Sequence, residues 1–491
     1  MKRTIYIFAA GIAGLFSFAS CSEWLDVVPN TDLPAKELFT TENGFTSALA
    51  GLYITMTDES TYGKNLTFGL TDQLAQMYDK IPDGVPSRKD VYIYDRETNG
   101  GYNTKGTIET IWQRQYHIIA NANNLLKWWE TNGEAVLVDT IVRRMIRGEA
   151  LALRAFLHFD LLRGWGPMDY AGNDKAKEMK CMPYRTVADH SKQPLLPAKS
   201  VVANIIKDLK EAREYLSYEK DLDLSDRVEQ RRLRMNYHAV NALLARVYNY
   251  AGEKDSASMY ARMVIDGCGL ELQSGNDGDP ILSNEVIFGI NMHELKVNLA
   301  EYFAVGDKMA AKYYLKTSTL NLIFEVTDAE SEDIRARGTA FYRRNEEQCA
   351  MSLKYIDNDN EIIPLIRLPE MYYIACETSE IGDEAAYYIN TVRNKRGLSK
   401  AKDVACDTEE KRFAALNREY CKEFYGEGQY FWFLKTRGVT GVLPHSPEVT
   451  LAEENFVFTL PDAEVEYGWA QEEGVAEEET LAGDGKIMPR N

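Results

Sequence analysis

Residues 236–266, NYHAVNALLARVYNYAGEKDSASMYARMVID, most strongly limit what this chain can fold into. Leu244, Ala245, Tyr248 and Gly252 have the spacing of a tetratricopeptide-type helix pair. In such a pair, small residues let two helices approach, the tyrosine packs between them and the glycine makes the turn. Stacked pairs of this kind bury a continuous core and leave a concave or flat face. The segment therefore predicts a helical-repeat scaffold.

Two other regions fit this pattern. Residues 366–397 predict a second pair with looser agreement, and helices at 108–130 and 141–163 predict a third. Apolar residues at helical spacing between Phe45 and Met56 predict an earlier helix, which Thr41 would cap. The predicted fold is mainly α, and its helical scaffold covers about 40–60, 108–266 and 366–437.

Residues 270–365 read as a layer inserted into this scaffold. They hold short strand-like runs, NEVIFGINM and SLKYIDNDNEIIPLIRL, separated by turns, and the insert also contains a short helical run. The carboxylates of DNDNE, at 357–361, alternate as in a calcium loop, but the sixth-position glycine and the distal glutamate are missing. We therefore predict a hairpin turn there and no metal site. Residues 60–107 lose helical period and predict a long loop.

The N-terminus has the pattern of an export signal. Lys2 and Arg3 precede an apolar run that is short for a membrane span, and Ala19 and Ser20 precede Cys21. The sequence FASC resembles the end of a bacterial lipoprotein signal, in which the cysteine carries the lipid, with Phe18 where an aliphatic residue is more usual. We predict cleavage after residue 20 and lipid attachment at Cys21. A plain signal peptide with an incidental cysteine is the alternative.

The charge of the chain bears on its partners. The formal net charge is −19 at pH 7, and loss of the two basic residues in 1–20 gives −21 for the mature chain. So acidic a surface repels nucleic acid, and no nucleic-acid partner is expected. It suits a neutral or cationic ligand. The acidic tail at about 470–491 has no aromatic residue and predicts disorder.

Familiar catalytic and metal motifs are missing from the sequence. It contains no HExxH, GxSxG, Walker loop or CxxC, and its six histidines lack ligand spacing. His158 and His238 fall in helical runs and are interpreted as structural. The six cysteines beyond Cys21 allow 15 pairings, among which sequence cannot choose; Cys376 in MYYIACE is interpreted as a small core residue. No catalytic residue, cofactor or metal is predicted.

Aromatic residues outside helical stripes are the best candidates for ligand contact. The chain has 29 tyrosines, and aromatic rings offer flat apolar faces on which sugar rings or peptides stack. Packing in the core is the alternative for any one of them. The predicted ligand-binding residues are Tyr78, Tyr92, Tyr94 and Tyr102 in the early loop, and Tyr302, Tyr313, Tyr314 and Tyr342 in the insert.

Six segments together resemble one known family. These are CSEWLDVVPNT, TTENGFTSALAGLY, RGEALALRAFLHFDLLRGWG, IPLIRLPEMYYIACE, YINTVRNKRGL and NREYCKEFYGEGQYFWFLKTRG. In their order and spacing they resemble the SusD/RagB family of outer-membrane nutrient-binding lipoproteins of Bacteroidetes, over nearly the whole of 21–491. The chain departs from the family's usual pattern at WGPMDY, at Tyr430 after GEGQ, and at LPDAEVEYGWAQEEG near the C-terminus.

The resemblance implies fold and function. It implies one SusD-like domain over 21–491, with tetratricopeptide-type pairs and a ligand-facing layer. It implies a lipid-anchored protein facing the cell exterior, which captures oligosaccharides for a SusC-like TonB-dependent outer-membrane barrel. Peptide capture by the same architecture is a close alternative. A helical-repeat interaction protein and a glycoside hydrolase are more distant alternatives. A glycosidase needs only two carboxylates, and in a chain with 75 acidic residues this signal has no specificity.

Overall fold

Helices build most of the molecule, which confirms the predicted mainly α fold. The computed structural model describes residues 35–79, 104–189, 191–226, 230–275, 278–303, 312–327, 332–344, 348–356 and 360–468. The signal sequence, Cys21, the tail and three of the predicted ligand tyrosines, Tyr92, Tyr94 and Tyr102, lie outside these residues.

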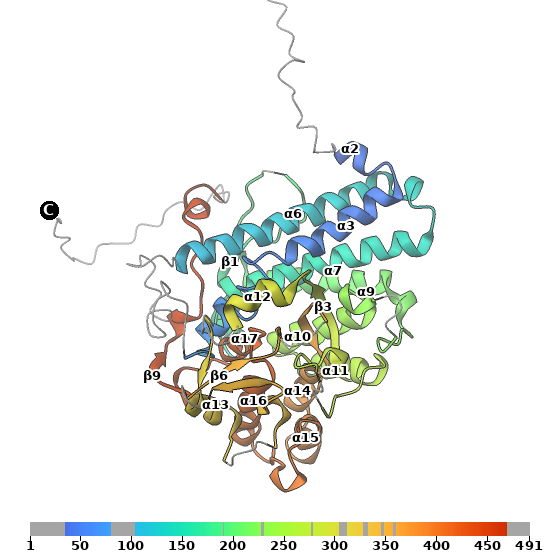
Figure 1. Cartoon of the computed structure of the whole chain (residues 1–491). Coiled ribbons are helices and arrows are strands. Elements are labelled where there is room, and N and C mark those ends of the chain that lie inside the picture. Colours follow the sequence, from blue (N-terminus) through green and yellow to red (C-terminus); the bar gives the residue numbers. More distant parts are fainter. Residues whose placement is uncertain are drawn as a thin grey trace, which may run out of the picture.

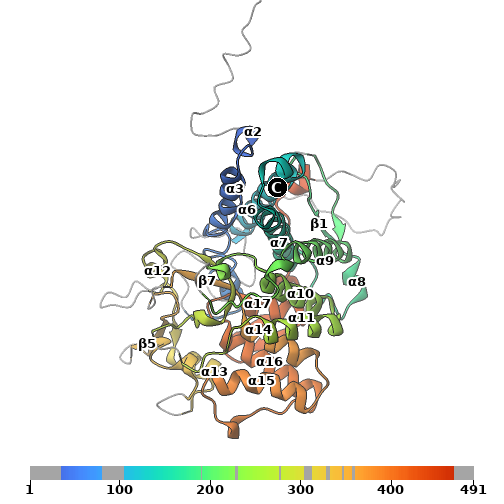
Figure 2. The same cartoon turned by 90° about the vertical axis from the view of Figure 1, so that its right-hand side faces the viewer.

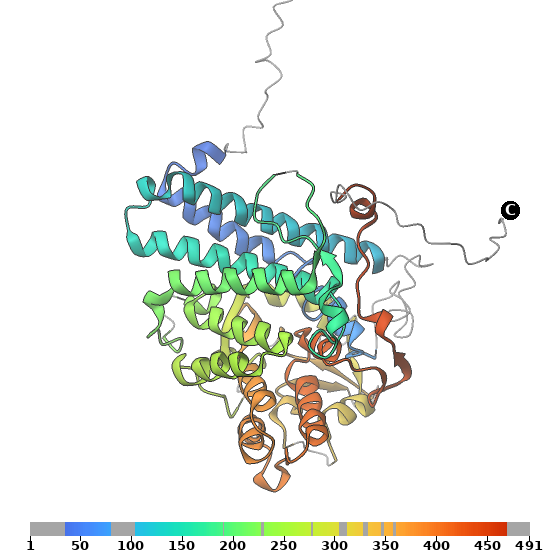
Figure 3. The same cartoon turned by 180° about the vertical axis from the view of Figure 1, so that it is seen from behind.

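The scaffold is a stack in which each long helix packs on the next along the chain. Contacts run from α3 to α6, then through α7, α9, α10, α11 and α14 to α15 (Figure 1). From behind, the sequence colours run in order from blue and cyan through green to orange down this stack (Figure 3). The helices are α2 (Ala35–Leu38), α3 (Glu42–Met56), α4 (Leu70–Leu74), α6 (Thr104–Val136), α7 (Thr140–Trp165), α8 (Asp174–Lys177), α9 (Ala198–Tyr215), α10 (Tyr237–Ala251), α11 (Lys254–Gly267), α12 (Leu295–Phe303), α13 (Thr317–Phe324), α14 (Leu368–Thr378), α15 (Asp383–Lys395), α16 (Glu409–Glu423) and α17 (Gln429–Thr436).

The α10/α11 pair forms as its spacing predicts. The Asn236 side chain caps α10 by accepting a hydrogen bond from the Ala239 N–H at 2.8 Å. Gly252 then turns the chain with φ of 78°, a conformation that suits glycine. Tyr248 and Tyr260 stack between the two helices with ring centroids 5.7 Å apart. The predicted pairs at 108–163 and 366–397 also form, as α6/α7 and α14/α15.

Short antiparallel strands come mainly from the predicted insert. The strands are β1 (Lys180–Met182), β2 (Leu196–Pro197), β3 (Val286–Asn291), β4 (Leu315–Lys316), β5 (Phe341–Arg344), β6 (Cys349–Ser352), β7 (Ile362–Arg367), β8 (Gly441–Leu443) and β9 (Ser446–Leu451). They pair as β1–β2, β3–β7, β4–β6–β5 and β8–β9. The insert, with α12, α13, β5 and β7, lies along one side of the helical stack (Figure 2).

The expected hairpin turn at 357–361 is wrong. The strands on either side of it, β6 and β7, belong to different sheets, because β7 pairs with the distant β3 and β6 pairs with β4 and β5. β6 and β7 therefore do not form a hairpin with each other. Asp357, Asn358 and Asp359 lie outside the described residues.

The expected long loop from residue 60 is corrected over its first part. Residues 60–78 are buried, apart from the partly exposed Lys64, and contain the short helix α4. Hydrogen bonds from side chains to nearby backbone carbonyls hold these residues in place. Thr61 donates to Met56 O at 2.9 Å, and Thr67 donates to Tyr62 O at 2.9 Å. Such local hydrogen bonds leave no periodic apolar stripe, so the sequence pattern does not reveal this part of the core.

No helix in the described part of the chain is both long and apolar enough to cross a bilayer.

Candidate functional site

Three of the predicted ligand tyrosines, from distant parts of the sequence, form one aromatic stack. Tyr78 and Tyr313 stack with ring centroids 4.4 Å apart and an interplanar angle of 18°. Tyr302 stacks on the other side of Tyr313, at 5.5 Å. The Tyr78 hydroxyl donates to Phe68 O at 2.9 Å. The early segment and the insert therefore meet in this stack.

This stack is part of the core. Tyr78, Tyr302 and Tyr313 are 1%, 6% and 2% exposed, so none of them presents a ring face to solvent. Burial raises the pKa of the Tyr78 hydroxyl, and the nearby Asp72 carboxylate raises it further. The structure gives these three rings a packing role, which corrects the expectation that they contact a ligand directly.

Two lysines cover the outer end of the stack. The ammonium groups of Lys64 and Lys312 lie 5.4 and 4.9 Å from the centroid of the Tyr302 ring. Glu59 and Glu301 in turn pair with these lysines. Burial is the main reason that the pKa of Tyr302 is raised. The exposed end of the stack is thus closed by charged groups.

The remaining two described tyrosines lie on the β4–β6–β5 sheet. Tyr342 of β5 pairs directly with Met351 of β6, and Tyr314 packs against Met351 and Cys349 from the other side. Neighbours that point the opposite way, including Phe341 and Ala350, belong to the main core. Tyr314, Met351 and Tyr342 therefore form one apolar row across the outer side of this sheet.

Exposure distinguishes this row from the buried stack. Tyr342 is 42% exposed and Tyr314 is half-buried. The early segment reaches the same edge, because the Asp79 N–H donates to Tyr314 O at 2.9 Å and the Asp79 carboxylate accepts from the Lys316 N–H at 2.7 Å. We refer to Tyr314, Met351 and Tyr342, with Asp79 at their edge, as the sheet face.

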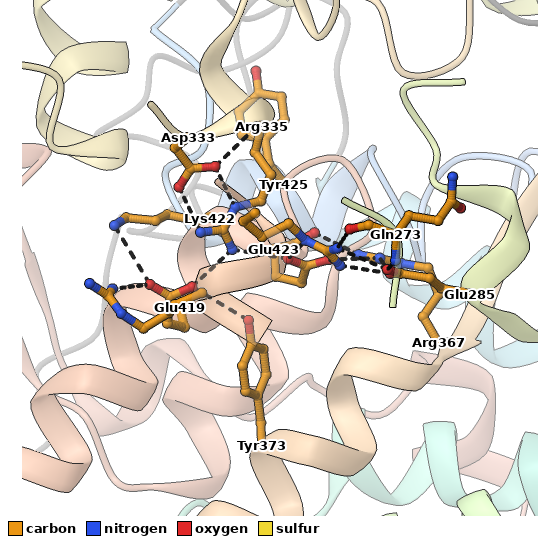
Figure 4. A network of polar contacts seen from close by, with 12 residues as sticks. Gln273, Glu285, Asp333, Arg335, Arg367, Tyr373, Glu419, Lys422, Glu423 and Tyr425 are labelled. Carbon is orange, nitrogen blue, oxygen red and sulfur yellow. Dashed lines mark hydrogen bonds and ion pairs between the residues drawn. The ribbon is translucent and has the colours of Figure 1, made fainter. Parts of the chain in front are cut away.

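An extended network of buried charges lies where the insert joins the helical scaffold (Figure 4). Arg396 is fully buried and bridges two carboxylates, Glu285 at 2.6 Å and Glu423 at 2.8 Å. Arg367 at the end of β7 reaches Glu423 at 2.7 Å and Glu427 at 2.8 Å. These contacts connect β7 to α15 and α16.

The network continues toward β5 and β6. Arg335, which lies just before β5, pairs with Asp333 at 2.7 Å and with Glu419 and Glu423 at 2.9 Å each. Lys354, just after β6, pairs with Glu427 at 2.6 Å. Three segments of the insert are therefore attached to α16 and the turn after it by ion pairs.

Two carboxylates of this network, Glu423 and Glu419, stay ionised. Burial opposes their charge, yet the guanidinium groups of Arg396, Arg367 and Arg335 hold the pKa of Glu423 well below its usual range. Arg335, Lys422 and Arg393 likewise lower the pKa of Glu419 to about 2, against the effect of burial.

Asp72, a buried carboxyl outside this network, connects the aromatic stack to the turn that begins α17. Asp72 accepts hydrogen bonds from the N–H groups of Gly426 and Gly428, at 2.6 and 2.9 Å, and from the Tyr78 hydroxyl at 3.2 Å. Burial raises the pKa of Asp72 to about 7, although those hydrogen bonds act in the opposite direction. A Cβ at Gly428 would lie 2.3 Å from Thr71 Oγ1, so this turn requires glycine.

Sequence reasoning missed the network. Its members Arg367, Arg396, Glu419, Glu423 and Glu427 all fall in the segments IPLIRLPE, TVRNKRGL and NREYCKEFYGEGQ, which carry the family resemblance. Arg367, a charged residue that interrupts the apolar run IPLIRL, was the available signal. As a site, the sheet face offers the exposed ring of Tyr342 and the half-buried ring of Tyr314 on either side of Met351, which is itself 0% exposed. Rings presented in this way suit binding by stacking.

The core histidine of α7 has a structural role, as its place in a helical run suggested. His158 Nδ1 contacts Arg154 O at 2.8 Å, its Nε2 accepts from the Arg185 N–H at 3.1 Å, and its ring stacks on Tyr184 at 3.9 Å. Within the described ranges, no group of three or more His, Cys, Asp or Glu residues could hold a metal ion.

Comparison with known proteins places the chain among relatives of one kind. A family model described as "Starch-binding associating with outer membrane" matches residues 23–249, and one described as "SusD family" matches residues 253–435. SusD-like protein P2 of Formosa agariphila is 28% identical over 257 residues, which are 51% of this chain and 44% of that protein. This match therefore spans less than half the length of that relative.

Solved structures share the fold over most of this chain. A SusD superfamily protein from Bacteroides thetaiotaomicron superposes with a TM-score of 0.68 at 21% identity, covering 87% of this chain and 98% of that one. A SusD-like carbohydrate binding protein from Bacteroides vulgatus gives a TM-score of 0.64 at 17% identity, with 87% and 96% covered. With two successive family models covering the chain from residue 23 to residue 435, the chain belongs to the SusD/RagB family.

Proposed function

We propose that this chain is a cell-surface lipoprotein that captures oligosaccharides and delivers them to a SusC-like, TonB-dependent outer-membrane barrel. Membership of the family supports the proposal, because one matching model is described as starch-binding and as associating with the outer membrane. A structural neighbour is described as carbohydrate-binding. Binding without catalysis is proposed, and turnover of a bound glycan by the purified chain would contradict it.

The sheet face is the observation on which the proposed ligand site rests. Tyr342 is the one predicted ligand tyrosine among the described residues that is more than one-third exposed. Its ring lies beside Met351, with Tyr314 across the same row. Apolar C–H faces of sugar rings can stack on such rings, while polar groups at the rim, such as the Asp79 carboxylate, accept hydrogen bonds from hydroxyls.

We expect Tyr342→Ala to weaken oligosaccharide binding about fivefold, because one stacking contact contributes about 1 kcal/mol. Isothermal titration of residues 22–491 with the bound glycan measures this change. Tyr387→Ala is the matched control, since Tyr387 is 63% exposed but lies on α15. Equal affinities of wild type, Tyr342→Ala and Tyr314→Ala would remove the sheet face as the ligand site.

A peptide ligand would use the same apolar row, so the titration also distinguishes the two ligand classes. Tight binding of peptides, together with no binding of any glycan, would replace the oligosaccharide by a peptide while leaving the architecture unchanged. Loss of that binding in Tyr342→Ala would still place the ligand on the sheet face.

Lipid attachment at Cys21 makes a separate prediction. We expect Cys21→Ala to move the protein from the outer-membrane fraction to the soluble fraction without unfolding it, because the lipid would be its anchor. Fractionation of cells that lack the partner barrel measures this. Cys181→Ala, which changes a buried thiol, is the control that should stay in the membrane fraction. A Cys21→Ala protein that still sediments with membranes would contradict the anchor.

A further inference from the structure

Two thiols lie in contact where α14, α15 and α16 meet. Cys376 belongs to α14 and Cys406 to the segment that leads into α16, and they are 0% and 1% exposed. Each thiol is the other's side-chain hydrogen-bond partner. From the sequence, 15 pairings of the six cysteines were equally possible; the fold brings together this pair.

The segment around Cys406 is held firmly against the helices. The Cys406 carbonyl accepts a hydrogen bond from the Gly382 N–H, at the start of α15, at 2.8 Å. Val404 exchanges two hydrogen bonds with the Asn390 side chain, both at 2.9 Å. Thr408 caps the first turn of α16. Cys406 is therefore fixed on both sides, and its sulfur cannot easily move away from Cys376.

Other cysteines of the described chain have different neighbours. The Cys181 thiol donates to Leu196 O at 3.8 Å, and the Cys421 thiol contacts Met77 Sδ at 3.9 Å. Cys349 packs with Met351 under Tyr314. These residues serve as internal controls, because they should remain thiols under conditions that join the first pair.

We propose that Cys376 and Cys406 are joined by a disulfide in the exported protein. The inference rests on the proposed function in one respect: export places the chain where disulfides form and persist. The bond would close a loop that contains the whole of α15, and it would tie α14 to the start of α16. Closing such a loop stabilises the fold chiefly by restricting the unfolded chain.

The bond would form by exchange with a small-molecule or protein disulfide. One cysteine thiolate attacks one sulfur of that oxidant and releases its first thiol. The other cysteine thiolate then attacks the cysteine sulfur of the mixed disulfide and releases the second thiol. The two protons lost by the cysteines end on the two released thiols.

Burial sets when this exchange can happen. Both sulfurs are shielded from an oxidant in the folded chain, so the exchange precedes the final packing of α14 against α15. We therefore expect oxidation to be rapid during refolding and slow in the native protein.

Refolding of residues 22–491 tests the proposal. The chain is unfolded in urea with reductant, refolded with a mixture of oxidised and reduced glutathione, alkylated and digested for mass spectrometry. The expected result is a Cys376–Cys406 linked peptide with the other four cysteines alkylated, and a urea midpoint that falls when reductant is added. Six alkylated cysteines, or a link between any other pair, would overturn the proposal.

Two variants complete the test. Cys406→Ser should lose the linked peptide and unfold at the same urea concentration with or without reductant. Cys268→Ser, which changes another buried thiol, should keep both the link and the sensitivity to reductant. Glycan affinity is measured in a separate titration, so failure of the disulfide and failure of oligosaccharide binding are read independently.

Discussion

Substitution of Arg396 by alanine is expected to lower the free energy of unfolding by about 3 to 5 kcal/mol. The guanidinium is 0% exposed and makes charged hydrogen bonds with Glu285 at 2.6 and 2.8 Å and with Glu423 at 2.8 and 3.0 Å. Removal of the guanidinium leaves the carboxylates of Glu285 and Glu423 buried without this positive partner. A charge that is buried away from water without a partner is costly. Urea denaturation followed by circular dichroism measures the change.

An exposed arginine provides the control for this experiment. Arg262 pairs with Glu384 at 2.6 Å, but the two side chains are 39% and 45% exposed. Pairs of this kind contribute at most about 1 kcal/mol, so Arg262→Ala should unfold close to wild type. If Arg396→Ala also stayed within 1 kcal/mol of wild type, the buried network would not be what holds the insert on the scaffold.

Acid is expected to remove the stabilisation that Glu419 provides. Its pKa falls from an ordinary value of 4.5 to about 2 in the folded chain. A carboxyl with a lowered folded-state pKa stabilises the fold fully above its unfolded pKa, and this stabilisation is lost as the pH falls through the window from 4.5 to about 2. By linkage the loss is at most about 3 kcal/mol. Urea midpoints measured across this window follow it.

Glu419→Gln separates this residue from other titrating groups. The variant should be less stable than wild type at neutral pH, yet its stability should change less between pH 4.5 and 2 because the titrating carboxyl is gone. Burial lowers the pKa of His158 to about 3. This histidine therefore destabilises wild type and Glu419→Gln equally as the pH falls below 6.5. If the stability of wild type and of Glu419→Gln changed in parallel with pH, the loss of stability could not be assigned to Glu419.

The helical scaffold was predictable because its residues follow a period. Tyr248 and Gly252 mark the α10/α11 pair through spacing alone, and the structure places both as that spacing requires. Thr41 likewise caps α3, accepting from the Gly44 N–H at 3.1 Å. Such signals are local, so a single sequence suffices to read them.

Pairings between distant residues were not predictable in the same way. Charged residues such as Arg396 and Glu285, 111 positions apart, look like surface residues until the fold brings them together. Tyr78 and Tyr313 lie outside helical stripes, and that pattern was interpreted as a sign of ligand contact, whereas their rings are buried in the core. Absence of a period therefore does not distinguish a ligand-facing aromatic from one packed in an irregular core.

Binding of a glycan by the soluble chain tests the central claim most directly. Residues 22–491 would be screened on glycan and peptide arrays, and the strongest ligand titrated against wild type, Tyr342→Ala and Tyr387→Ala. We predict saturable binding of an oligosaccharide that weakens about fivefold in Tyr342→Ala and is unchanged in Tyr387→Ala. Absence of binding to any glycan, or hydrolysis of the bound glycan, would contradict the account.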